Sequence, residues 1–287
     1  MATAADGLSY SGQQVRRYDN DRFLTALFAP ADRREDLFAL YAFNLEIAKT
    51  REVVTEAMLG RIRLQWWREA IAALYGENGG VSIDQNEVLR PLADAIGRHG
   101  LSREYFERLI DAREADLDEE PPASLACLAN YAEVTSAPLV LLGLEVLGVR
   151  DGVTVEAGRN VGVAWALTGL LRAVPFHASQ RRLYLPADRL VHHGVRAGRV
   201  LDLKPEPELK PVIREVTEMA RHRLAQARSR HREVPRAALP ALLSATLADS
   251  YLDALAREDY DVFAPRVRMP HPFRQARLAW WAMRGRY

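Results

Sequence analysis

The sequence predicts an all-α protein, a single-domain helical bundle. Apolar residues recur at three- and four-residue spacing along most of the chain, which is the period of a helix buried on one side. Strand patterns are nearly absent, and residues 182–185 form the only short β-like run. No segment repeats with a period of 20–50 residues, so a solenoid is excluded. The 287 residues, 48% of them hydrophobic, are enough for one large core.

Four helices are expected in the first part of the chain, over residues 31–53, 55–75, 87–98 and 102–117. Leu59, Ile62 and Trp66 repeat at three and four in the second of them and form the apolar stripe of an amphipathic helix. Ser102 has the position of an N-cap for the fourth. The acidic residues 116–122, closed by two prolines, are expected to form a solvated connector.

Four more helices are expected over residues 124–147, 153–177, 206–232 and 235–257. The first contains Pro138, which predicts a kink. In the second, Gly162 and Gly169 are seven residues apart on one face, so a close approach of another helix would compensate for two glycines inside a helix. Pro175 is expected to disturb or shorten that helix.

Composition and motifs exclude several classes of protein. The net charge of +1 gives no basic field for nucleic acid. Glycine-rich phosphate loops, zinc-protease motifs and nucleophile elbows are missing from the sequence. The single cysteine, Cys127, excludes a disulfide framework and is expected to be a buried, inert thiol. The first fifteen residues show no secretory signal, and no run of about 18 apolar residues occurs, so a cytoplasmic protein is expected.

A helical domain over residues 1–265 is expected to be followed by a basic, aromatic C-terminal tail, 266–287. Residues 264–287 contain six arginines and no acid. Phe273, Ala276 and Trp280 would share one face of a short helix. Two interpretations remain open, an anionic membrane interface or a terminal helix that buries its tryptophans on the domain. The residues expected at the membrane are Arg274, Arg277, Trp280 and Trp281.

Two segments carry a resemblance to a known family. Residues 38–52 (FALYAFNLEIAKTRE) and 162–186, which contain Leu-Thr-x-x-Leu-Arg and Arg-x-Tyr-Leu-Pro, resemble the two signature regions of the squalene/phytoene synthase family. Residues 130–139 resemble the tyrosine-led central helix of that family, and Asp116 lies where the family has an aspartate. The resemblance covers roughly residues 15–265. It implies a bundle of the trans-isoprenyl diphosphate synthase (terpenoid synthase) type.

The resemblance also implies a metal site, and the sequence departs from it there. Family members hold Mg²⁺ and diphosphate between two DxxxD motifs, in which a spacing of four puts both carboxylates on one helix face. The matching positions are Ala48 and Glu52 in one motif and Ala173 and His177 in the other, so one acid of four remains. Because Mg²⁺ must neutralise the leaving diphosphate, we expect no efficient ionisation, no bound metal and no cofactor.

Five further positions match family residues near the pocket: Tyr41, Tyr131, Thr168, Arg172 and Tyr184. They are expected either to belong to the core or to line a residual apolar cavity for a lipid or prenyl-chain ligand. An open apolar tunnel between the helices that hold Glu52 and Arg172 would favour lipid binding. A filled core would favour a purely structural adaptor.

Residues 61–68, 193–195 and 261–265 are similar to the branch of this family that contains the mitochondrial complex I assembly factor. That branch implies a non-catalytic scaffold or lipid-binding factor in biogenesis of NADH:ubiquinone oxidoreductase. It also implies complex I subunits as partners. The tail adds the inner-membrane surface as an expected partner, and no nucleic acid is expected because the positive charge is confined to that tail. An N-terminus without an Arg- and Ser-rich transit segment favours a bacterial source. The alternative is an active prenyl-transferring enzyme that holds Mg²⁺ with Glu52 and either Glu46 or Glu56.

Overall fold

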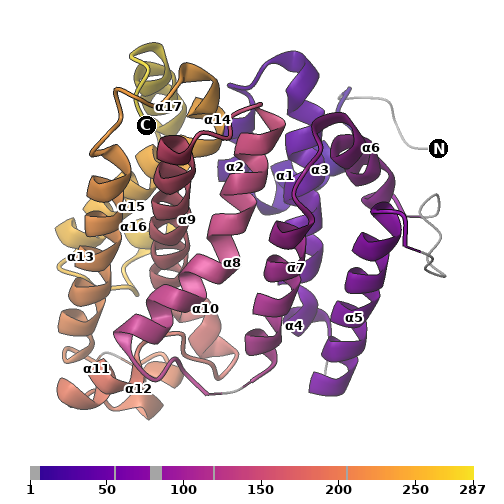
Figure 1. Cartoon of the computed structure of the whole chain (residues 1–287). Coiled ribbons are helices and arrows are strands. Elements are labelled where there is room, and N and C mark those ends of the chain that lie inside the picture. The colour runs from indigo at the N-terminus through magenta and orange to yellow at the C-terminus, as the bar shows by residue number, and fades with distance from the viewer. Residues whose placement is uncertain (1–6, 55, 78–85, 119, 205) are drawn as a thin grey trace.

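The computed structural model describes residues 7–54, 56–77, 86–118, 120–204 and 206–287. Over these residues it contains helices and no strand, which confirms the predicted all-α class. Figure 1 shows the long helices α13, α9, α8, α7 and α5 side by side, with α3 and α15 behind them and α14 and α17 at one end. α8 packs along α9, and α9 packs along α13.

The elements before α8 are α1 (Tyr10–Tyr18), α2 (Asn20–Ala26), α3 (Ala31–Ala48), α4 (Thr50–Val53), α5 (Ala57–Leu74), α6 (Leu89–His99), α7 (Arg103–Ala112) and the 3₁₀ turn η2 (Arg113–Leu117). The remaining elements are α8 (Leu125–Val146), α9 (Gly152–Arg172), α10 (Val174–Ser179), α11 (Ala187–His192), α12 (Ala197–Leu201), α13 (Leu209–Arg228), η3 (Arg236–Ala238), α14 (Leu239–Leu242), α15 (Ser244–Arg257), α16 (Pro265–Arg268) and α17 (Arg274–Met283).

Side-chain caps explain where the central helices begin. The Ser124 hydroxyl accepts a hydrogen bond from the Cys127 backbone N–H at 3.2 Å, and the Asp151 carboxylate accepts one from Thr154 N–H at 2.9 Å. Each bond satisfies a backbone donor that a helix start leaves free. Ser102 occupies the predicted N-cap of α7 but makes no capping bond, because its hydroxyl donates to Glu145 at 2.6 Å.

The core consists of two groups of buried apolar side chains that join into one. The first group lies among α8, α9, α13 and α15, and the second lies among α1–α3 and α5–α7. Tyr105, Leu147 and Trp165 pack against both groups.

α8 is, within the described ranges, the one helix long and apolar enough to cross a membrane, but 61% of its most apolar window is buried inside the bundle. It is therefore the central helix of the core.

Two expectations about burial are wrong. The stripe of Leu59, Ile62 and Trp66 is exposed, while α5 buries Leu64 and Trp67 on its other side. Because α5 is apolar on two sides, its periodicity alone does not identify the inner one. Cys127 is exposed rather than buried, since it lies in the first turn of α8, outside the core.

Candidate functional site

Both helices that carry the family's metal-motif positions are interrupted at those positions. α3 ends at Ala48, and Glu52 lies on the separate helix α4. α9 ends at Arg172, so Ala173 lies in the break and His177 lies on α10. The second break agrees with the effect expected of Pro175, which lacks an N–H and sits in the first turn of α10. The breaks are local, because Ala48 and Glu52 still line one cavity and Ala173 and His177 line another beside it.

A small cavity, here called the inner hollow, lies between these helix ends. One part has a volume of about 210 Å³ and the adjoining part about 240 Å³, and both are lined by Arg113, Tyr131 and His177. Oxygen and nitrogen atoms of its walls, such as Asn44 Oδ1, Ser136 Oγ and His177 Nδ1, are buried without a partner among the described residues. The walls thus combine polar and apolar side chains, unlike those of an apolar tunnel.

Asp116 binds three side chains at the floor of the inner hollow. Its carboxylate accepts hydrogen bonds from the hydroxyls of Tyr131 at 2.5 Å and Tyr184 at 3.1 Å, and it pairs with Arg113 at 3.2 Å. We call these four residues the Asp116 cluster. Asp116 is only 5% exposed, so the prediction that this acidic stretch is a solvated connector is wrong for it. The carboxylate stays buried because Arg113 compensates its charge.

The phenols of the Asp116 cluster stay protonated and act as donors. Burial raises the pKa of Tyr131 well above its usual value, and the nearby Asp116 charge raises it further. The same two causes, burial first, raise the pKa of Tyr184. Since both hydroxyls are directed at Asp116, its carboxylate has few lone pairs left for any metal ion.

Arginines dominate the charge around the inner hollow. Arg51, Arg113 and Arg182 line its smaller part, where the only carboxylates among the described lining residues are Glu52 and Asp116. Arg182 also donates to the backbone carbonyls of Asp116 and Asp118 and so holds the acidic segment in place. An excess of fixed positive charge repels a divalent cation.

His177 is neutral in the folded protein. Burial lowers its pKa to about 4, against a raising effect of Asp116 and a further lowering by Arg182. In the unfolded chain a histidine is protonated below about pH 6.5. The stability contributed by the neutral ring is therefore complete above pH 6.5 and is lost as the pH falls towards 4.

We expect the native protein to lose about 2 kcal/mol more stability between pH 7 and pH 5 than the His177→Gln variant, because glutamine takes up no proton in this range. Urea unfolding at the two pH values measures the difference. Equal losses in both proteins, or an NMR titration midpoint near pH 6.5 for the His177 ring, would contradict the assignment.

The residues of the inner hollow do not fit a magnesium cluster. Glu52 is the one acid left at the motif positions, and burial and the Asp116 charge, in that order, raise its pKa. Glu46, proposed as an alternative ligand, already binds Lys49 and, at 2.7 Å, Arg63. Glu56 lies exposed before α5. Across the described parts of the chain, no three His, Cys, Asp or Glu side chains are grouped to hold a metal ion.

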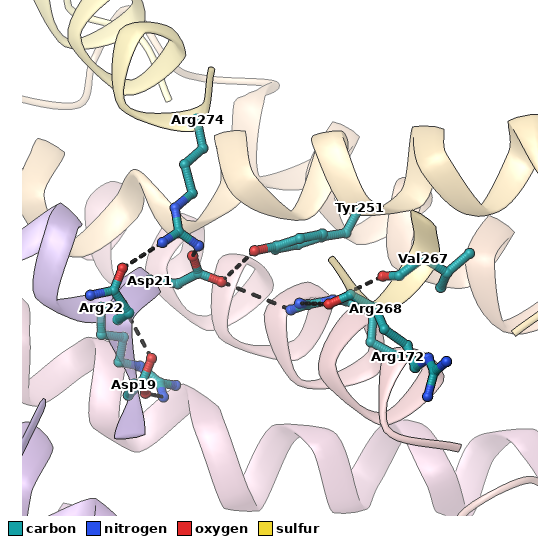
Figure 2. Close-up of polar contacts among 9 residues, drawn as sticks. Asp19, Asp21, Arg22, Arg172, Tyr251, Val267, Arg268 and Arg274 are labelled. Carbon is teal, nitrogen blue, oxygen red and sulfur yellow. Dashed lines mark hydrogen bonds and ion pairs between the residues drawn. The ribbon is translucent and has the colours of Figure 1, made fainter. Parts of the chain in front are cut away.

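Arg172, expected near the pocket, points instead to the C-terminal segment (Figure 2). Its guanidinium lies 3.5 Å from the centre of the Tyr251 ring and donates to the carbonyls of Val267 and Arg268 at 3.4 and 3.2 Å. Asp21 on α2 forms an ion pair with Arg172 at 3.8 Å and accepts a hydrogen bond from the Tyr251 hydroxyl at 2.6 Å. The carboxylate of Asp21 thus joins α2, α9 and α15.

The other expected pocket residues divide between the cavity and the core. Tyr131 and Tyr184 line the inner hollow. Tyr41 belongs to the second core group, and burial raises its pKa to about 12. Thr168 is 1% exposed and donates to the Ala164 carbonyl one turn earlier, so it has a structural role. The sequence did not point to Arg51 or Arg113, although Arg113 and Asp116 have the i, i+3 spacing of a helical ion pair.

A larger open groove of about 960 Å³ adjoins the Asp116 cluster on the outside. It runs between the start of α5, η2 and the start of α8, and its walls include Cys127, Tyr131 and Tyr184. Asp111, Asp118 and Glu120 stand on its rim with the exposed Arg61. The groove is open to solvent and is lined mainly by acidic charged side chains, whereas the charged side chains of the inner hollow are mainly arginines.

Comparison with known proteins shows the family of the chain. The model of the squalene/phytoene synthase family matches residues 15–275. The chain belongs to this family. It is 34% identical over 278 residues to the mouse protein named NADH dehydrogenase (ubiquinone) complex I, assembly factor 6, covering 97% of this chain and 82% of the relative. It is 31% identical to the presqualene diphosphate synthase of Rhodopseudomonas palustris, over 58% of each chain.

Solved structures of the family share the fold. A dehydrosqualene synthase in complex with ligand superposes with a TM-score of 0.81 at 17% identity, over 96% of this chain and 94% of that chain. The relatives named as assembly factor come from animals and from Dictyostelium discoideum. They give no support to a bacterial source, which stays a prediction.

Proposed function

We propose that this chain is a non-catalytic member of the family that acts in the biogenesis of respiratory complex I. The observation that carries the proposal is the inner hollow, where arginines and the Asp116 cluster stand in place of two carboxylate pairs. The likeness to the assembly factor 6 proteins over nearly the whole chain supports the same role.

The size of the inner hollow supports a structural role. Its two adjoining parts, of about 210 and 240 Å³, together lie only near the lower end of the roughly 300–1,000 Å³ range of small-molecule pockets. Joining two prenyl diphosphates would need room for two chains and divalent ions to withdraw charge from the leaving group. The arginines and buried polar atoms of its walls therefore favour an adaptor that works through its surface over a lipid-binding tunnel.

Complex I subunits, or a partly built complex, are the partners that this role requires. We place the chain at the surface of the membrane that carries the complex, as a peripheral protein. The exposed apolar side chains of α5, namely Met58, Leu59, Ile62 and Trp66, leave a protein surface free for such contacts.

Purified protein given Mg²⁺ with farnesyl or geranylgeranyl diphosphate is expected to form no squalene, phytoene or presqualene diphosphate, because the metal ligands are missing. Product analysis by mass spectrometry measures this, with an active synthase of the family as the positive control. Mg²⁺-dependent product that disappears in Glu52→Ala would overturn the proposal and establish a relocated metal site.

Complementation tests the role itself. Removing the gene from its source organism is expected to reduce assembled complex I, and both the native chain and Glu52→Ala are expected to restore it. Rescue by the native chain but not by Glu52→Ala would show that the remaining acid has a catalytic task. Normal complex I without the gene would reject the assembly role.

A further inference from the structure

We propose that α17 binds an anionic lipid surface through the side that it turns away from the bundle. This outer face of α17 consists of Phe273, Ala276, Trp280 and Met283, with arginines beside it. The proposal rests on the geometry of the C-terminal segment and deepens the peripheral location proposed above, and its test measures vesicle binding and not complex I assembly.

The outer face is apolar, although it is exposed. Phe273, Trp280 and Met283 are 69%, 50% and 68% exposed, and they recur at helical spacing on one side of α17. Leu278, on the opposite side, is completely buried, and Trp281 packs against the second core group. The two tryptophans thus lie on different sides: Trp281 packs on the domain, and Trp280 is left for a surface outside it.

One ion pair and one hydrogen bond to α2 fix the rotation of α17 (Figure 2). Arg274 donates to the Asp21 carboxylate at 2.9 Å and to the Asn20 side-chain oxygen at 2.5 Å. Arg274 therefore belongs to the inner side and is not available to a membrane. Because Arg274 and Leu278 are both held inward, Trp280 has no inward position to adopt.

The charge of the segment complements an anionic surface. Residues 262–287 contain six arginines and no acid. Arg284 is exposed and lies 4.1 Å from the centre of the Trp280 ring, and Arg286 is exposed next to it. Arg266 is 85% exposed and has one acid close by, Glu258 at 3.5 Å. Trp beside Arg at the edge of an apolar stripe is typical of helices at the membrane–water interface.

The area of the outer face favours lipid over a protein partner. A ten-residue helix is about 15 Å long and about 10 Å wide, so one face covers roughly 150 Å². A stable protein interface needs about 800 Å² from each partner. A helix at a lipid surface needs no such area, because its side chains sink among the head groups and arginines attract the phosphates.

Vesicle co-sedimentation of the full chain tests the proposal. We expect binding to phosphatidylcholine vesicles with about 30 mol% phosphatidylglycerol, weak binding to phosphatidylcholine alone, and loss of binding near 0.5 M salt. Trp280→Ser with Met283→Ser should weaken binding about ten-fold. Arg284→Gln with Arg286→Gln should weaken it about 20-fold. Point changes are preferred to deletion of the segment, because deletion would remove the buried Leu278 and Tyr287 and expose the core residues that they cover.

The matched control is Met58→Ser with Ile62→Ser on α5, whose side chains are 60% and 59% exposed. It removes similar exposed apolar surface on α5, where the neighbouring arginines lie beside acids. Arg63 pairs with Glu46, and Arg61 lines one groove with Asp111, Asp118 and Glu120, so we expect vesicle binding unchanged within about two-fold. Thermal unfolding confirms that all variants fold. Binding equal in native and α17 variants would overturn the proposal, as would equal losses in the control. A dimer in solution that Trp280→Ser dissociates would identify a second copy as the occupant instead.

Discussion

Asp116→Ala is expected to lower the free energy of unfolding by about 4 kcal/mol, the range found when one partner of a buried ion pair is removed. The change leaves the buried Arg113 guanidinium without its counter-charge and the hydroxyls of Tyr131 and Tyr184 without their acceptor. Urea denaturation at pH 7, followed by circular dichroism, measures the loss.

Asp118→Ala is the matched control, since Asp118 is exposed two residues further along the same segment. Its side chain takes no part in the Asp116 cluster, so the loss should stay below about 0.5 kcal/mol. If Asp116→Ala cost no more than Asp118→Ala, the cluster would not be the structural centre of this region.

Gly162→Ala should destabilise the protein by about 3 kcal/mol, because α8 and α9 touch there without space for a side chain. A Cβ at this position would lie 2.6 Å from Ala137 Cα and 2.9 Å from Ala137 N. These are backbone atoms in the middle of α8, so they cannot rotate away. Thermal and urea unfolding both report the effect.

Gly169→Ala, on the same helix, is expected to have the opposite effect on stability. No atom lies within 4 Å of a Cβ built there, and the residue is exposed. Alanine should therefore raise stability by up to about 1 kcal/mol through its helix propensity. Destabilisation of similar size at both glycines would mean that helix propensity, and not the approach of α8, governs these positions.

The helical periodicity of the sequence was sufficient to predict the fold class, and tertiary packing decided the details. Gly162 and Gly169 look alike in sequence, yet α8 approaches only the first of them closely. In α5 both the stripe through Ile62 and the one through Leu64 are apolar, and packing against neighbours such as α7, η2, α4 and α6 determines which becomes buried. Local spacing carries no information about the position of a partner helix.

The sequence was sufficient to predict which metal ligands the candidate site lacks, but not which interactions replace them. The absent acids at Ala48 and Ala173 can be read directly from the motif spacing. The Asp116 cluster joins η2, α8 and the segment before α11, so no local pattern describes it. Arg172 was expected at the pocket because of its motif, but Asp21 and two C-terminal carbonyls outside that motif bind it instead.

The interrupted helices at Lys49 and Ala173 have a consequence for any attempt to restore the family's chemistry. Aspartates returned to positions 48 and 173 would sit at the ends of shortened helices, with Arg51 and Arg182 lining the same space. Each new carboxylate would form a salt bridge with one of these arginines in preference to binding a Mg²⁺ ion from solution. Restoring the aspartates at the motifs alone would therefore produce further salt bridges and would not produce synthase activity.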